Sequence, residues 1–305
     1  MNSVLSLNQT IGVYEIGVLI SFALLGVATT QTYIYYTRFP DDYIKLKTLV
    51  AVVWLFEVAH AGCIGHVLYS YTITAYSHPD ILIRVPISLG VAIFFAGIIT
   101  ACVQGFFTFR IYAFSKKLFI PVLLWTTILL RLLGSTVILV TESRSTLLAD
   151  YEARWAWLFM TVWSLSVAND VTITVTLVIL LYRRRPDVLQ RTTALVDKLI
   201  AWTIETGMLT SAVSIVTLTC FITTRESFIF LATFSVTSRL FSNSLLASLN
   251  SRTVLRAMNE IPTPCLKLPD DWPTNGGQAS KVSELVFVVG SRTTSNGTNI
   301  VSRNT

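Results

Sequence analysis

Seven long apolar stretches, separated by short polar segments, are the feature that most constrains the fold of this chain. A helix needs about 20 predominantly apolar residues to cross a bilayer, and each stretch is long enough. The stretches extend approximately over Tyr14–Tyr36, Leu46–Tyr69, Ile87–Phe109, Leu118–Thr141, Trp155–Tyr182, Leu199–Ile222 and Phe228–Leu249. The sequence therefore predicts an all-α, polytopic membrane protein built as a seven-transmembrane-helix bundle.

Composition favours a bilayer over water as the surrounding solvent. Of the 305 residues, 53% are hydrophobic and only 13% are charged, against about 25% charged residues in an average soluble domain. The net charge of +6 comes from basic residues that stand mostly at the ends of the stretches, where they set topology and contact anionic lipid. We therefore expect the lipid bilayer as a partner and no nucleic acid.

The connecting segments alternate between rich and poor in Lys and Arg. One set carries thirteen of these residues and the other carries four. Because cytoplasmic segments of membrane proteins hold the excess of basic residues, this pattern predicts the N-terminus outside and the C-terminus in the cytoplasm. Asn8, in the sequon Asn8-Gln9-Thr10, then falls on the outer side and is a glycosylation candidate. We expect the plasma membrane in preference to an endomembrane.

Three regions follow from these observations. Residues 1–13 form a short outer N-terminal segment, and residues 14–250 form the seven-helix transmembrane domain. Residues 251–305 are rich in Ser, Thr, Asn, Gly and Pro, a composition typical of disorder. They are therefore predicted to form a disordered cytoplasmic tail.

Ionisable side chains inside the apolar stretches are the candidates for a ligand or ion site, because a charge at membrane depth is rare outside functional positions. The rise of about 1.5 Å per residue places four of them at the same depth near the midplane, namely Glu57, Arg131, Asp170 and Arg239. Glu205 lies nearer the cytoplasmic side. The complete set is Glu57, His60, Arg131, Asp170, Glu205 and Arg239.

Two cations and two anions at one depth suggest mutual pairing, since an unpaired charge there costs at least about 2.5 kcal/mol. The preferred pair is Arg239 with either Asp170 or Glu57. Asn243 and Asn250 share a helix face with Arg239. A structural network that fixes helix packing and a site for a ligand, an ion or a proton both remain open.

Other chemistry has little support in the sequence. Glu57 and His60 have the Glu-x-x-His spacing of some metal-binding bundles, but only one copy exists. We therefore predict no metal site and no cofactor. No Walker loop and no nucleophile elbow occurs in the sequence, so we expect that the protein is not an enzyme.

Four short motifs stand near the ends of the stretches. They are Gln31 with Tyr33, Tyr35, Tyr36, Asp42 and Lys47; Gln104-Gly105-Phe106-Phe107 with Arg110-Ile111-Tyr112; Asp197-Lys198-Leu199-Ile200 with Glu205-Thr206-Gly207-Met208-Leu209-Thr210; and Asn243-Ser244-Leu245-Leu246-Ala247-Ser248-Leu249-Asn250-Ser251-Arg252. Together they resemble a large group of seven-span membrane proteins of mushroom-forming fungi, catalogued as a domain of unknown function. The resemblance covers about Gly17 to Arg252. It implies seven helices and a membrane location, and it supplies no activity, ligand or catalytic residue.

The motif residues gather at the predicted cytoplasmic ends of the helices. Candidates for this face are Arg110, Lys198, Asn250 and Arg252. They would contact a cytoplasmic protein partner in a receptor. In a structural role they would meet lipid headgroups and helix carbonyls.

Two functions from different classes remain. The first is a receptor-like or sensory protein, favoured by the topology and the basic inner segments, with residues 183–198 as the coupling surface. The alternative is a transporter or channel for a small solute or a proton, which would use the midplane charges.

Overall fold

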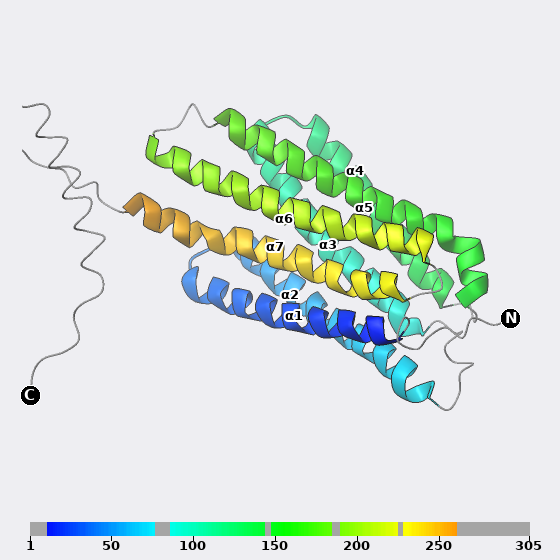
Figure 1. Ribbon diagram of the computed structural model, residues 1–305. Coiled ribbons are helices and arrows are strands. Elements are labelled where there is room, and N and C mark those ends of the chain that lie inside the picture. Colours follow the sequence, from blue (N-terminus) through cyan, green and yellow to red (C-terminus); the bar gives the residue numbers. More distant parts are fainter. Residues whose placement is uncertain (1–10, 77–85, 144–147, 185–189, 225–227, 261–305) are drawn as a thin grey trace, which may run out of the picture. The chain divides into compact units, whose positions relative to one another are not determined.

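The computed structural model describes residues 11–76, 86–143, 148–184, 190–224 and 228–260. The chain divides into two units, Met1–Ile261 and Pro262–Thr305, and every described residue belongs to the first. In these ranges the structure is helical, and Figure 1 labels the α-helices along the chain. The elements are α1 (Val13–Arg38), α2 (Ile44–Tyr69), the π-helical turn η2 (Ser70–Thr74), α3 (Ile87–Ser115), α4 (Phe119–Glu142), α5 (Leu148–Arg184), α6 (Gln190–Thr223) and α7 (Ile229–Glu260).

Six of the described helices are long and apolar enough to cross a membrane. These segments are Val13–Arg38, Ile44–Thr74, Ile87–Ser115, Phe119–Glu142, Arg154–Arg183 and Ile200–Thr223. The chain is therefore an integral, multi-pass membrane protein. The seventh expected span is a helix, but it is not among the six, because Arg239 and a series of serines and asparagines make α7 more polar. α7 also continues through Ser251–Glu260, where the sequence predicted a disordered tail.

Prolines help to set two of the helix boundaries. α1 ends at Arg38, two residues before Pro40, because proline disfavours helical geometry in the residue that precedes it. α3 begins directly after Pro86, whose backbone is extended. Lys116 ends α3 in the left-handed region, with φ at 57°, and its N–H donates to the carbonyl of Tyr112 at 2.9 Å.

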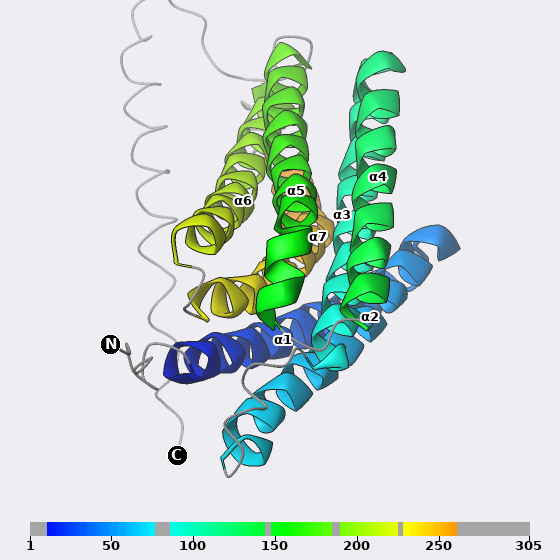
Figure 2. The same ribbon diagram turned by 90° about the vertical axis from the view of Figure 1, so that its right-hand side faces the viewer.

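The helices pack in a closed ring in chain order. Each helix contacts its neighbour in the sequence, and α7 closes the ring on α1. α3 also contacts α5 and α7, and α2 also contacts α7, so these contacts cross the inside of the ring. Figures 1 and 2 show the resulting bundle from two directions, with α7 running beside α1.

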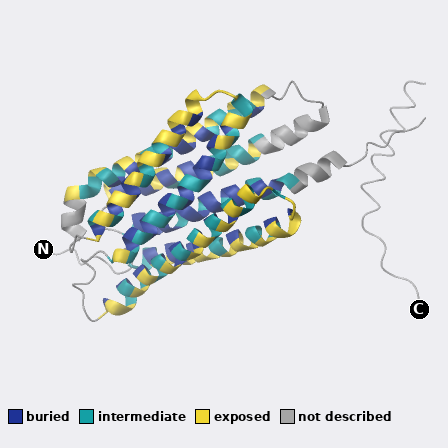
Figure 3. Ribbon diagram, turned by 180° about the vertical axis from the view of Figure 1, so that it is seen from behind, coloured by how far each residue is buried: buried dark blue, intermediate teal, exposed yellow. Residues whose placement is uncertain are grey.

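The bundle has two ends, a first end and a second end. The first end is where α1, α3, α5 and α7 begin, and the second end is where they finish. An apolar cluster fills the first end, with Tyr14, Tyr71, Phe159, Trp163 and Phe234 among its members. A second apolar cluster lies toward the second end and joins α1, α2, α3 and α7. Figure 3 shows the buried residues facing inward and the exposed ones facing out.

A layer of buried polar side chains lies between these two clusters. It includes Ser21, Glu57, Gln104, Asp170 and Arg239, each no more than 5% exposed. Hydroxyl groups elsewhere on the helices are mostly satisfied locally, as Thr172 and Thr219 each donate to a carbonyl four residues earlier. The polar layer instead makes contacts between helices, so the candidate site lies there.

Candidate functional site

Glu57 of α2 and Arg239 of α7 form an ion pair in which both side chains are 0% exposed. The Arg239 guanidinium also donates from Nη1 to the main-chain carbonyl of Glu57 at 2.7 Å and from Nε to Ser21 Oγ at 2.9 Å. The Ser242 hydroxyl donates to Glu57 Oε1. This arrangement, called the ion-pair cluster below, ties α1, α2 and α7 together.

His60 and Asn243 flank the ion-pair cluster. His60 Nδ1 lies 3.4 Å from the Ser238 hydroxyl, and its ring meets Phe234 edge-on at 5.7 Å between centroids. Asn243 Nδ2 donates to the carbonyl of Leu24 at 3.2 Å and to that of Arg239 at 2.8 Å. His60 therefore packs α2 against α7, and Asn243 packs α7 against α1.

Asp170 belongs to a different cluster, on the α3, α4 and α5 side of the bundle. Gln104 Nε2 donates to Asp170 Oδ1 at 2.7 Å, and Asn169 Nδ2 donates to Gln104 Oε1 at 3.4 Å. The Thr127 hydroxyl in turn donates to Asn169 Oδ1 at 2.7 Å. We call these four residues the amide cluster. Of the two partners that the sequence offered for Arg239, the structure places Glu57 in contact and leaves Asp170 elsewhere.

Within the described part of the chain, Arg131 of α4 makes no direct ion pair. It lines a cavity of about 20 Å³ together with Ser135, Ser166 and Ser238. A cavity of that size holds a single water molecule. Of the four charges at one depth, Glu57 and Arg239 therefore form a direct ion pair, whereas Asp170 accepts from Gln104 and Arg131 lines this small cavity.

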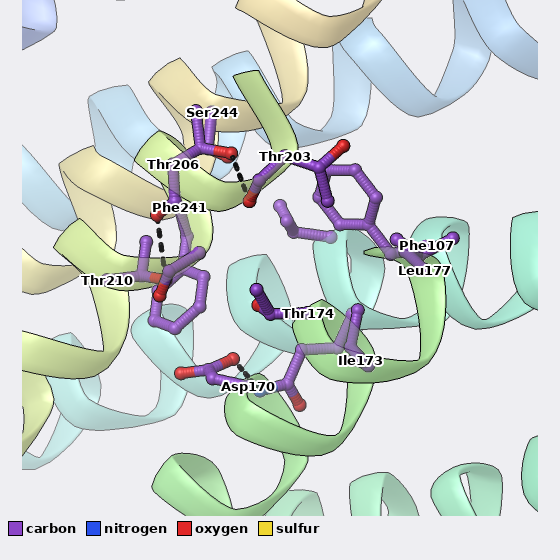
Figure 4. Close-up of a pocket in the computed structure, with 13 residues that line it drawn as sticks. Phe107, Asp170, Ile173, Thr174, Leu177, Thr203, Thr206, Thr210, Phe241 and Ser244 are labelled. Atoms are coloured by element: carbon purple, nitrogen blue, oxygen red, sulfur yellow. Dashed lines mark hydrogen bonds between the residues drawn. The ribbon is translucent and has the colours of Figure 1, made fainter. Parts of the chain in front are cut away.

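A second small cavity, of about 30 Å³, lies beside Asp170. Figure 4 shows the hydroxyl-bearing side chains of Thr174, Thr206, Thr210 and Ser244 around it, from α5, α6 and α7. Asp170 Oδ2 is buried without a protein hydrogen-bond partner. A cavity of this size beside a carboxylate oxygen without a protein partner has room for a water molecule, which would satisfy that oxygen.

The largest of the three cavities, about 460 Å³, lies at the second end between α1, α3, α6 and α7. We call it the end cavity. Its charged lining residues are Arg38, Arg110 and Glu205, and its apolar ones include Phe107 and Trp202. It shares Phe107, Thr203 and Thr206 with the cavity beside Asp170. The two cavities therefore adjoin one another beside α3 and α6. Neither Glu57 nor Arg239 lines any of these three cavities.

The remaining predicted residues of the second end hold helices together. Arg252 donates to both carboxylate oxygens of Asp42, at 3.2 and 2.6 Å, and its guanidinium lies over the Phe39 ring at 4.5 Å. The Tyr35 hydroxyl donates to Asp42 Oδ2 at 2.8 Å. Asn250 Nδ2 donates to the carbonyl of Gln31 at 2.9 Å. These contacts fasten the end of α7 to the end of α1.

Arg110 lines the end cavity and donates to the Ser248 hydroxyl at 3.2 Å. Glu205 lies in the same cavity and outside both midplane clusters. The side chain of Lys198 and the whole of Asn8 fall outside the described residues.

Sequence reasoning missed several partners of the charged residues. Gln104 bridges Asp170 and Asn169, whereas the sequence pattern places it only in a motif. Its long amide side chain within an apolar stretch was the available signal. Ser21 and Ser242 carry no such signal, because serine hydroxyls in membrane helices are commonly satisfied by their own helix.

Residues 166–254 match DUF6534, a family of unknown function. The matched segment holds the second half of α5, all of α6 and most of α7, and therefore includes Asp170, Arg239 and Arg252. No curated protein and no solved structure matches the chain. The match agrees with the resemblance to a family without an assigned function. The fungal origin and the seven-span layout stay predictions.

Proposed function

We propose that α7 is a seventh span and that the N-terminus lies outside the cytoplasm. The packing of α7 supports this, because it contacts α1, α2, α3 and α6 and buries residues from Phe230 to Leu249 along its length. Its one midplane charge is paired with Glu57, which removes most of the penalty for placing Arg239 in the membrane. The basic residues at the second end support a cytoplasmic location for that end.

On this topology the protein is a receptor-like, sensory membrane protein, and the end cavity is its ligand site. The observation that carries this proposal is the cavity itself. At about 460 Å³ it has the size of a small-molecule site, and it is bounded by four helices that come from both halves of the chain. A ligand there would contact α6 together with α1, α3 and α7. Binding would therefore favour one arrangement of these ends over another.

A cytoplasmic protein partner would detect the change. Residues 183–198 include the end of α5, the segment between α5 and α6, and the first turns of α6. They carry a concentration of basic residues, so they form the coupling surface in this proposal. The proposal includes no catalytic step, no metal and no cofactor. It places the protein in the plasma membrane.

A cavity-filling substitution tests the sensory function. Ala247 lines the end cavity and is itself exposed, so Ala247→Trp should fill the cavity without disturbing the core. In a strain that lacks the native gene, we expect this variant to reach the membrane and to fail to restore the wild-type transcript profile. Ala51→Trp, at an exposed position of α2 outside the end cavity, is the matched control and should restore it. Full rescue by Ala247→Trp would overturn the proposal.

Transport of a proton or small solute is the second candidate, favoured by the position of Asp170. Its carboxylate borders a water-sized cavity that shares residues with the end cavity, while the aromatic cluster fills the first end. Access from one side to a midplane acid is the arrangement that a transporter needs in one of its states. The ion-pair cluster takes no part in this candidate function.

Reconstitution separates the two candidates. Purified protein in liposomes with an internal pH-sensitive dye should show proton flux under an imposed gradient if the protein transports protons. Asp170→Asn should then abolish the flux, and Arg154→Gln, an exposed change near the first end, should leave it intact. Equal flux in wild type and Asp170→Asn would remove Asp170 from the pathway. No flux from the wild type would exclude proton transport.

A further inference from the structure

The cavity of about 20 Å³ beside Arg131, called the arginine cavity below, has one charged group in its lining and no carboxylate. Its lining comes from α3, α4, α5 and α7. The other lining residues with a hydroxyl or an indole N–H are each no more than 8% exposed, namely Thr100, Ser135, Trp163, Ser166, Thr237 and Ser238. The arginine cavity shares no lining residue with the cavity beside Asp170 or with the end cavity. A ligand in it is therefore independent of the sensory and transport functions.

Arg131 has no counter-charge in direct contact. Among the described residues its Nε is buried without a hydrogen-bond partner, and neither direct ion pair includes it. A guanidinium keeps its proton in a protein, and an uncompensated charge at membrane depth is strongly unfavourable. A water molecule would solvate this charge without neutralising it. The arginine cavity therefore suits an anion better than a water molecule.

Two further donors of the arginine cavity come from α5. Thr100, Ser135 and Thr237 each donate to a carbonyl four residues earlier in their own helix. The Ser166 hydroxyl and the Trp163 indole N–H have no such acceptor in the described part of the chain. Both groups are therefore available to an acceptor inside the cavity.

A fourth donor depends on the tautomer of His60. Its Nδ1 lies 3.4 Å from the Ser238 hydroxyl oxygen. With its proton on Nδ1, His60 donates to that oxygen and leaves the Ser238 proton for the occupant of the cavity. A guanidinium, two hydroxyls and an indole N–H then converge from α4, α5 and α7.

The volume and the walls of the arginine cavity select a small anion. Its volume of about 20 Å³ exceeds the ~10–15 Å³ that one water molecule needs by this measure. Chloride is only slightly larger than water, whereas carboxylates and phosphates are much larger. The remaining walls are apolar and come from Ile93, Ala96, Val162 and Phe234. They would surround a monatomic anion without competing for its donors.

We propose that the arginine cavity is a binding site for a small monovalent anion, chloride being the abundant one of that size. The anion is held by the Arg131 guanidinium and by the hydroxyls of Ser166 and Ser238. It neutralises Arg131 as Glu57 neutralises Arg239, and it links α4, α5 and α7 at one point.

Asp170 is the alternative counter-charge for Arg131, because it lies one turn beyond Ser166 on α5. It accepts instead from Gln104 and does not line the arginine cavity. The two alternatives differ in what chloride does. If Asp170 neutralises Arg131, chloride should stabilise the Asp170→Asn variant and leave the wild type unaffected. That result would overturn the proposal.

Thermal unfolding of the purified full-length protein tests the anion site. In a neutral detergent, sodium gluconate would be replaced stepwise by sodium chloride or sodium bromide at constant ionic strength. We expect the unfolding midpoint to rise and to saturate with either halide, because gluconate is too large for the cavity. Equal midpoints in gluconate and chloride would overturn the proposal.

Variants locate the site. Arg131→Gln should abolish the saturable rise, and Ser166→Ala should weaken chloride binding about tenfold by removing a hydrogen bond to a charged group. Ser214→Ala is the matched control, because Ser214 is a buried serine of α6 outside the cavity, and it should keep the wild-type response. An unchanged response in Arg131→Gln would overturn the assignment. If that variant fails to fold, unchanged affinity in Ser166→Ala would do so.

A crystal grown in bromide supplies the direct observation. Bromide scatters anomalously and water does not. An anomalous peak within hydrogen-bond distance of Arg131 and Ser166 would support the proposal, whereas a cavity without such a peak would overturn it.

Discussion

Arg239 is the largest fully buried side chain of the described bundle, and its contacts explain how α7 keeps a charge among apolar helices. The guanidinium has three kinds of acceptor, namely the Glu57 carboxylate, the Glu57 carbonyl and the Ser21 hydroxyl. A buried ion pair is not by itself a source of stability, because both charges are desolvated. Removing one partner destabilises the protein strongly, because the other charge is then buried and unpaired.

We therefore predict that Arg239→Ala lowers the free energy of unfolding by about 3–5 kcal/mol. The double variant Glu57→Gln with Arg239→Met should recover part of that loss, because neither charge remains. Chemical denaturation in detergent measures the free energy of unfolding of the single and the double variant. Arg154→Ala is an exposed control that should change this free energy by less than about 0.5 kcal/mol. A single variant as stable as the control would show that the pair contributes nothing.

Gln104 should matter less to stability than Arg239. It donates to Asp170 and accepts from Asn169, but hydrogen bonds between membrane helices are worth only about 0.6 kcal/mol on average, with a maximum near 1.7. Gln104→Leu should accordingly reduce the free energy of unfolding by about 0.5–2 kcal/mol. The same denaturation assay compares the stability losses of Gln104→Leu and Arg239→Ala. A loss larger than that of Arg239→Ala would mean that the amide cluster holds the bundle together.

At the scale of helices, the pairing of α1 with α7 depends on close approach as well as on polar contacts. A Cβ atom built on Gly17 would lie 2.6 Å from the main chain of Ala232, whereas one on Gly26 of the same helix would meet nothing within 4 Å. Small residues at such crossings let two helix backbones come together in a membrane.

These two glycines give a matched pair of variants. Gly17→Ala should destabilise by about 1–3 kcal/mol, because main-chain atoms must move to relieve the overlap. Gly26→Ala should be neutral or stabilising by up to about 1 kcal/mol, since alanine favours the helix. Thermal unfolding in one detergent compares them directly. Equal midpoints would argue against a tight α1–α7 crossing.

The contact between Arg252 and Asp42 is partly open to solvent, with side chains 30% and 14% exposed. Solvent screening limits such pairs to about 1 kcal/mol or less. Asp42→Asn should therefore change global stability little and act locally. We expect faster amide hydrogen exchange near Tyr35 and the end of α7, read by mass spectrometry. Unchanged exchange would show that the ends of α1 and α7 are held by the surrounding apolar contacts alone.

At the scale of the whole molecule, an odd number of spans places the termini on opposite sides of the membrane. An N-terminal extension carrying a glycosylation sequon should be modified in microsomes, because the basic residues favour the second end as the cytoplasmic one. The same extension after Thr305 should stay unmodified. Modification at both termini, or at neither, would indicate an even number of spans and remove α7 from the membrane.

Much of the architecture could be predicted from the sequence. Apolar stretches of spanning length predicted the helices, because a bilayer requires every backbone polar group to be satisfied within its own segment. The polar content of α7 is the exception, since Arg239 and its neighbouring serines lower its hydropathy below that of the six other helices. Depth along a helix was also predictable, since residue number converts directly to rise.

The partners of the buried charges could not be predicted in the same way. Depth restricted Arg239 to two acids. Only the contacts across the ring, of α7 with α2 and of α5 with α3, decided that Arg239 meets Glu57 while Asp170 meets Gln104. The end cavity likewise depends on side chains from four helices. The sequence determined the helical, membrane-spanning character of the chain, because spanning requirements act on one segment at a time. The tertiary structure decided the pairings of the charged residues and the cavity. These depend on the rotation and the neighbours of each helix, about which the hydropathy pattern carries little information.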